Sequence, residues 1–179
     1  DDAGPFDAAF LVAGAGDTRE TGRRFESAEL VARLGLVNYV SPAALAAELG
    51  ERMAARGAGR IVLVGSAAAS HPLPFAAAYS SSKCGLSLFA EGLRLALKPH
   101  GVVVTLASPG FFAAATEGAH GYARPGEIAP RRVAKTIIEA AAARRSEVVT
   151  PGWFVLLRWL AIVLPRPLRD RLLLSLPIP

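Results

Sequence analysis

Three side chains that can handle protons lie within one short stretch, 65–85 (GSAAASHPLPFAAAYSSSKCG). Ser66 follows an apolar run, Tyr79 comes after a loop with two prolines, and Lys83 stands four residues beyond Tyr79. Residues four apart on a helix share one face. A helix through this stretch would therefore present Tyr79 and Lys83 together, and a serine at the end of the preceding strand would add a hydroxyl to the phenol and the ammonium.

These three groups suit acid–base work on an oxygen. A tyrosine has an unperturbed pKa of about 10 and is a poor acid–base catalyst at neutral pH. A nearby ammonium stabilises the phenolate and lowers that pKa. We therefore predict Tyr79 as the acid–base and Lys83 as the group that lowers its pKa, with Ser66 donating a hydrogen bond to a substrate carbonyl. Taken one by one, a Tyr and a Lys at this spacing are usually surface residues, and a Ser after a strand usually marks a turn.

Apolar runs alternate with helical patterns along the chain. The expected strands are 7–13, 60–64, 102–106 and 147–150, and the expected helices are 27–36, 42–56, 77–97 and 130–144. Ser27 and Ser41 are the expected N-caps of the first two helices. The alternation predicts an α/β fold, with helices flanking a parallel sheet in three α/β/α layers. Gly14, Ser66 and Pro109 follow strands, at the edge where such sheets bind ligands.

The stretch around Ser66 resembles the core of the short-chain dehydrogenase/reductase family. In that family a serine lies thirteen residues before the tyrosine of a Tyr-x-x-x-Lys motif, the spacing of Ser66 and Tyr79 here. Asn38, in Val-Asn-Tyr, matches the asparagine that the family carries in the preceding helix. The resemblance implies catalytic roles for Asn38, Ser66, Tyr79 and Lys83.

Two further motifs extend the resemblance over 6–150. Ala13-Gly14 resembles the end of the family's Asn-Asn-Ala-Gly motif, and Pro109-Gly110 resembles its Pro-Gly motif. The resemblance implies that these four residues bind the cofactor, NAD or NADP, together with Tyr79 and Lys83. It also implies a Rossmann-like fold and an oxidoreductase that interconverts a carbonyl and an alcohol by hydride transfer, with Tyr79 as acid–base. In that reading Lys83 holds the nicotinamide ribose and Asn38 holds a water that connects Lys83 to solvent.

The sequence departs from the family at the phosphate-binding turn. The family begins with a Thr-Gly-x-x-x-Gly-x-Gly turn whose helix cradles the pyrophosphate. Residues 14–19 (GAGDTR) begin like a Gly-rich loop but carry Arg19 in place of the third glycine, and they follow the strand that matches the family's fourth. We therefore expect 1–179 to be one partial Rossmann domain that lacks the first strands and leaves its first strand with a bare edge. Cofactor binding would then require the missing N-terminal part.

The loops beside the expected site are apolar. His71 lies between Ser66 and Tyr79, and Phe111 and Phe112 follow the Pro-Gly motif. We predict that Ser66, His71, Phe111 and Phe112 line the substrate pocket, which favours a small apolar carbonyl or alcohol. Ordinary core packing is the alternative for the two phenylalanines.

The chain ends in an apolar and basic tail, 151–179, which we expect to be helical. Its segment 153–164 (WFVLLRWLAIVL) is too short to span a bilayer, and its Trp, Leu and Arg suit a membrane interface. It could equally cover the sheet or a neighbouring subunit. The alternatives to an active oxidoreductase are an inactive truncated or non-catalytic member of the family and a membrane-surface interaction protein.

Composition narrows the classes of partner. The chain has 20 basic and 15 acidic residues, and its arginines occur as scattered pairs, so we do not expect nucleic acid as a partner. A single cysteine excludes an internal disulfide and fits a reducing, cytoplasmic location, with peripheral membrane contact as the alternative.

His71, His100 and His120 share no ligand spacing, so no metal site is predicted. No apolar run reaches the roughly 18 residues of a membrane span. The family resemblance implies a homo-oligomer for the full-length protein.

Overall fold

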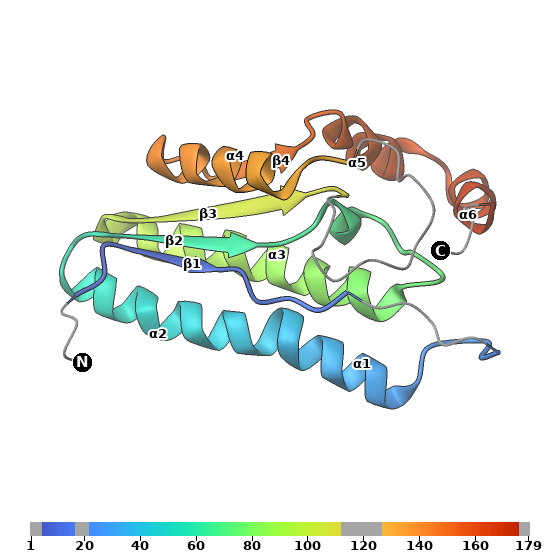
Figure 1. Cartoon of the computed structure of the whole chain (residues 1–179), viewed down its shortest axis with the longest axis horizontal. Helices are drawn as coiled ribbons and strands as arrows, with labels where there is room; N and C mark the ends of the chain where they lie inside the picture. The colour runs from blue at the N-terminus through green and yellow to red at the C-terminus, as the bar shows by residue number, and fades with distance from the viewer. Residues whose placement is uncertain (1–4, 17–21, 112–126, 176–179) are drawn as a thin grey trace.

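The structure of the chain is a computed structural model that describes residues 5–16, 22–111 and 127–175. In these residues one sheet is formed by β1 (Ala8–Leu11), β2 (Gly59–Val64), β3 (Val102–Pro109) and β4 (Glu147–Thr150), in that spatial order. All neighbouring pairs are parallel: Ala8 lies opposite Arg60, Gly59 opposite Val102, and Leu106 opposite Glu147. The predicted parallel α/β fold is confirmed (Figure 1).

Helices cover both faces of this sheet. The α-helices are α1 (Ala28–Gly35), α2 (Ser41–Ala55), α3 (Ala77–Leu97), α4 (Pro130–Ala142), α5 (Phe154–Val163) and α6 (Arg166–Leu174). Three short turns of other helix types are η1 (Leu36–Val40), η2 (Ala67–Ser70) and η3 (Lys98–His100). Helices α1 to α3 lie on one side and α4 on the other, and α5 and α6 lie beyond the carboxyl ends of the strands (Figure 1).

The core lies on both faces of β2 because successive strand residues point to opposite sides. Ile61 and Leu63 are fully buried against α2 and α3, in a cluster that includes Met53 and Leu86. Val62 is fully buried on the other face, in a cluster with residues of α4. A strand buried on both faces reads as a continuous apolar run, as residues 61–64 do.

Strand β1 differs from β2 because only one of its edges is paired within the described residues. It bonds to β2 alone, and Phe10 in this strand is 42% exposed. Val12, just after the strand, is 66% exposed. Apolar side chains along an unpaired strand edge are prone to pair with another chain. This agrees with the bare edge expected from the sequence.

The two helices expected over 27–36 and 42–56 form one continuous helix. Ser27 caps its start, with the Leu30 amide donating to Ser27 Oγ at 3.2 Å. Ser41, the expected second N-cap, is instead helical and donates its amide to the carbonyl of Leu36, five residues back. Pro42 has no amide hydrogen and would break an α-helical hydrogen-bond ladder. The π turn η1 lets the helix run on through the proline, which sequence patterns did not show.

The helix Ala28–Ala55 is long and apolar enough to cross a membrane, judged by length and composition alone. This differs from the expectation that no apolar segment reaches that length. In the fold, the helix packs against α3 and the sheet and buries the polar side chain of Asn38. Because a third of this segment is buried in the fold, these contacts account for part of its apolar composition.

Candidate active site

The fold brings Ser66 and Tyr79 into direct contact. Ser66 follows β2 and caps η2, with the Ala68 amide donating to Ser66 Oγ at 3.1 Å. Tyr79 is the third residue of α3. The Ser66 hydroxyl interacts with the Tyr79 phenol and favours its ionised form, which lowers the pKa of Tyr79. The hydroxyl and the phenol that the sequence places thirteen residues apart therefore meet at the carboxyl edge of the sheet.

Lys83 lies one turn further along α3 and is buried, with only 4% of its surface exposed. Its ammonium donates to the carbonyl of Val64, the last residue of β2, at 3.0 Å. Burial lowers the pKa of Lys83 to about 8, because a low-dielectric environment disfavours the charged form. Gly14 makes room for this ammonium: a Cβ atom at position 14 would lie 3.0 Å from Nζ.

The pKa of Tyr79 is raised above its ordinary value, chiefly because burial disfavours the phenolate. The hydrogen bond with Ser66 opposes this by a smaller amount. The sequence predicts instead that Lys83 lowers the pKa of Tyr79. The structure differs because the Lys83 ammonium donates to Val64 and because desolvation outweighs the favourable contact with Ser66.

Asn38 connects the end of β1 to α3. It is fully buried and lies in the π turn η1. Its amide group donates to the Ala15 carbonyl at 2.9 Å and to Ser82 Oγ at 3.1 Å, and its Oδ1 accepts from the Ala15 amide at 2.7 Å. Ser82 in turn donates to the carbonyl of Tyr79 at 2.8 Å. Asn38 therefore fixes the residues that follow β1 against the helix that carries Tyr79 and Lys83.

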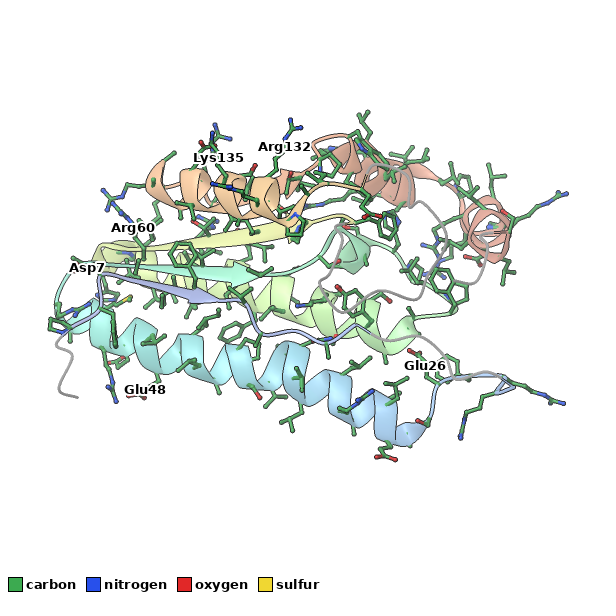
Figure 2. All side chains as sticks on the ribbon, in the orientation of Figure 1. Asp7, Glu26, Glu48, Arg60, Arg132 and Lys135 are labelled. Carbon is green, nitrogen blue, oxygen red and sulfur yellow. The ribbon has the colours of Figure 1, made fainter. Side chains whose placement is uncertain are left out.

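Sequence reasoning missed Glu26, a buried carboxylate beside this helix. Both of its oxygens accept from the Ala78 amide, at 3.0 and 3.2 Å. Ala76, the N-cap residue of α3, has no side-chain acceptor, so Glu26 caps the helix from a distant loop (Figure 2). An anion at a helix N-terminus also interacts favourably with the helix dipole. The signal that could have indicated such a cap is the long helix expected over 77–97, which has no capping residue of its own at its start.

The Pro-Gly motif packs against the C-terminal segment. The Gly110 amide donates to the Thr150 carbonyl at 2.8 Å, and a Cβ atom at position 110 would overlap the ring of Phe154. Phe111 meets the same ring edge-to-face, with centroids 6.1 Å apart. Of the residues predicted to line the substrate pocket, Phe111 is 44% exposed and Phe112 lies outside the described residues.

His71 directly follows the short turn η2, which Ser66 precedes, and it is half-buried. Burial lowers its pKa, so the neutral imidazole dominates near pH 7. The part of the chain that the structure describes contains no group of three His, Cys, Asp or Glu side chains placed to hold a metal ion.

Known proteins match this chain in sequence. The family model of the short chain dehydrogenase matches residues 3–123. Dehydrogenase/reductase SDR family member 7B of Xenopus laevis is 31% identical over 126 residues, which is 64% of this chain and 39% of that protein. An uncharacterized oxidoreductase of Myxococcus xanthus (strain DK1622) is 31% identical over 169 residues, 94% of this chain and 66% of that protein. The chain thus spans less than half the length of the first relative.

Solved structures match it in fold. A short-chain dehydrogenase from Burkholderia cenocepacia J2315 in complex with NADP superimposes with a TM-score of 0.77 at 24% identity, covering 95% of this chain and 69% of that one. A short-chain dehydrogenase from Sphingobium yanoikuyae in complex with NADPH gives 0.74 at 23% identity, covering 96% and 66%. The sequence match and the shared Rossmann-like fold agree: this chain belongs to the short-chain dehydrogenase/reductase family.

Proposed function

We propose that the protein is an NAD(P)-dependent oxidoreductase that interconverts a carbonyl and an alcohol. One observation carries the proposal: the Ser66 hydroxyl interacts with the Tyr79 phenol, and the buried Lys83 lies one turn beyond Tyr79 on α3. A hydroxyl and a phenol in contact form a pair that can hold one substrate oxygen and exchange a proton with it.

The residues at this edge fit the nicotinamide and ribose end of a dinucleotide. Lys83 and Tyr79 supply an ammonium and a hydroxyl for ribose oxygens, and Gly14 leaves the backbone after β1 uncovered beside the Lys83 ammonium. When bound, NAD or NADP supplies the hydride chemistry. In our proposal this end of the cofactor is held by Ala13, Gly14, Tyr79, Lys83, Pro109 and Gly110. The pyrophosphate would need groups that residues 14–19 do not provide.

The protein's own residues then move the proton. In the reductive direction Ser66 donates a hydrogen bond to the substrate carbonyl, and Tyr79 gives its proton to the oxygen as negative charge develops there. In the oxidative direction Tyr79 accepts the proton of the alcohol. Because burial raises the pKa of Tyr79, its protonated form dominates at neutral pH. The protonated phenol is the form that donates the proton in reduction.

Apolar side chains support a small apolar substrate. Phe111 follows the Pro-Gly motif, is partly exposed, and rests against Phe154 at the edge where Ser66 lies. A carbonyl compound with an aliphatic or aromatic body would contact these rings while its oxygen points to Ser66 and Tyr79. We include His71 among the substrate-facing residues on the ground that η2 begins next to Ser66 and ends next to His71.

Exposed apolar residues on the long helix and on α3 support a homo-oligomer of the full-length protein. Val40 and Leu45 on the long helix are about half exposed, and Leu88 and Leu95 on α3 are 77% and 58% exposed. Helices α2 and α3 contact each other, and exposed large apolar side chains on neighbouring helices suit a subunit interface. The single cysteine supports a reducing, cytoplasmic location for this assembly.

The test is Tyr79→Phe in the full-length protein. We expect turnover of apolar ketones or aldehydes, followed by the absorbance of the reduced nicotinamide, to fall by about 10²- to 10⁴-fold because the proton donor is lost. Cofactor affinity, measured by calorimetry, should fall by far less than turnover, because Lys83 still supplies a donor to the ribose. Tyr39→Phe is the matched control, since Tyr39 lies on the long helix and is partly exposed. Unchanged turnover in Tyr79→Phe would contradict the assignment, and a wild-type protein without turnover would favour the non-catalytic alternative.

A further inference from the structure

The C-terminal helices α5 and α6 expose apolar side chains to solvent. Six of these side chains are more than half exposed: Leu156, Trp159, Ile162, Val163, Leu168 and Leu174. Figure 1 shows the two helices beyond the carboxyl ends of the strands, at one end of the molecule. Large apolar side chains exposed together at this density are typical of an interaction site.

Only one narrow face of α5 contacts the protein. Phe154, Leu157, Ala161 and Leu164 recur every three or four residues and are the buried or half-buried positions of the segment. The rest of the helix should be polar if it faced water, but Arg158 is its single charged residue and is bonded to Glu147 at 2.6 Å. The outward face of α5 is therefore apolar all along its length.

The helix that follows α5 is basic. Helix α6 carries Arg166, Arg169 and Arg171 against one acid, Asp170, which pairs with Arg169 at 3.2 Å. Arg166 and Arg171 are exposed and have no ion-pair partner among the described residues. Exposed tryptophan and leucine together with exposed arginine are typical of helices that lie in the interface of an anionic bilayer.

We propose that α5 and α6 dock on the surface of an anionic lipid bilayer. The ten residues of α5 extend about 15 Å, half the hydrocarbon thickness of a bilayer, so the helix can lie in the interface but cannot cross. Trp159 and the leucines enter the interface, and Arg166 and Arg171 meet the phosphates.

Docking on this surface would hold the active site close to the lipid. Helix α5 contacts η2, the turn that Ser66 caps, and Phe154 at its start packs against Gly110. An apolar substrate dissolved in the bilayer would then reach the site without crossing bulk water. The docking itself does not depend on the proposed reaction, so the two can be tested separately.

The chain provides its own reporter of docking. Both of its tryptophans, Trp153 and Trp159, lie at or in α5. Trp153 stacks on Phe154, with centroids 4.0 Å apart, whereas Trp159 is 62% exposed. In a Trp153→Phe background, Trp159 emission should shift to shorter wavelength with vesicles of phosphatidylglycerol and phosphatidylcholine, and brominated lipids should quench it. Vesicles of phosphatidylcholine alone should give a much weaker effect.

Two sets of variants locate the contact by co-sedimentation with the same vesicles. Leu156→Glu with Ile162→Glu should reduce binding by at least about 10-fold, because charges would enter the apolar layer. Arg166→Gln with Arg171→Gln should reduce it by about 30-fold and remove most of its salt dependence. Ile138→Glu is the control, since Ile138 is 57% exposed on α4, away from this surface. Circular dichroism should show unchanged folding in all of these variants, because the altered side chains are exposed.

Three results would overturn the proposal. The first is no co-sedimentation and no shift in emission with anionic vesicles. The second is binding that persists in the Leu156→Glu, Ile162→Glu variant. The third is a concentration-dependent shift of Trp159 emission without lipid, accompanied by self-association that this variant abolishes; a second copy of the chain would then cover the surface.

Discussion

Helix α3 is distinguished by the polar side chains that it buries, and helix α5 by the apolar side chains that it exposes. Helix α3 buries Ser80, Ser82 and Lys83, and no buried side-chain nitrogen or oxygen in the described parts of the chain lacks a hydrogen-bond partner. Helix α5 has one charged residue and exposes Leu156 and Trp159. The first helix thus buries polar groups, and the second leaves apolar groups uncovered.

Each of these arrangements costs free energy in an isolated chain. A buried ammonium carries a desolvation penalty that one carbonyl contact does not fully offset, and an exposed apolar face forgoes about 25 cal/mol per Å². A buried ammonium and an exposed apolar face are both expected where they have a function in addition to stabilising the fold. For Lys83 we infer a chemical role, and for the outward face of α5 a partner surface. Phe154 joins the two regions, because it belongs to α5 but packs against Gly110 after β3.

The largest expected effect is a loss of stability when a side chain on the inner face of α5 is removed, compared with one on its outer face. Phe154→Ala should lower the free energy of unfolding by about 3 kcal/mol, because a buried ring leaves a cavity. Trp159→Gln, five residues on, should change it by less than about 0.5 kcal/mol, because that side chain is exposed. Urea unfolding followed by circular dichroism measures both values. Equal losses would mean that the outer face is also packed.

A double-mutant cycle sharpens the same prediction. Gly110→Ala alone should be destabilising, since its methyl group would overlap the ring of Phe154. In a Phe154→Ala background the cavity accepts that methyl group, so Gly110→Ala should cost much less there. Additive effects would show that the two residues are not in contact.

The next largest effect on stability comes from the buried ammonium of Lys83. The pKa of Lys83 is about 8 in the folded protein and 10.5 unperturbed, so below pH 8 the folded state carries the cost of holding a charge that the unfolded state holds in water. The penalty amounts to roughly 3 kcal/mol at about 1.4 kcal/mol per pKa unit. Lys83→Met should therefore stabilise the fold at pH 7 by about 2 kcal/mol, after loss of the hydrogen bond to Val64.

The pH dependence of this gain has a definite sign. Between pH 8 and 10.5 the unfolded state binds the proton more readily than the folded state, so wild-type stability attributable to Lys83 rises with pH. The advantage of Lys83→Met should shrink over that window. Lys135→Met is the matched control, because Lys135 is exposed on α4 (Figure 2). Thermal unfolding midpoints at about pH 7 and pH 10 measure the effect: a gain that does not change with pH would contradict the lowered pKa.

The layout of the fold could be predicted because its signals are local. The structure has strands at the apolar runs 60–64 and 147–150, and it has a helix at 77–97, as the sequence predicts. The joining of two helices at Pro42 could not be predicted, since a proline after a serine usually starts a helix. Only the π turn, a tertiary accommodation that buries Asn38, makes the continuous helix possible.

Spacing and family resemblance predicted that Ser66, Tyr79 and Lys83 would lie near one another, and the structure places Tyr79 and Lys83 on α3 and Ser66 at the end of β2. The sequence did not show that burial would dominate the pKa values of Tyr79 and Lys83, because desolvation depends on the whole surrounding structure. The capping role of Glu26 could not be predicted for a related reason. Its partner, Ala78, is 52 positions away in the sequence, and no local pattern predicts a cap from that distance.

Glu26 provides the smallest of these effects and the most specific one. Glu26→Ala should cost about 1 to 2 kcal/mol, because the Ala78 amide loses its acceptor and α3 loses a negative charge at its N-terminus. Ser27→Ala should cost a similar amount, because Ser27 caps α1 through the Leu30 amide. Only the first change touches the turn that positions Tyr79, so kcat should fall in Glu26→Ala and not in Ser27→Ala. Equal kcat values in the two variants would show that Glu26 only stabilises the helix as a cap. A loss of kcat in Glu26→Ala alone would show that Glu26 positions the catalytic helix.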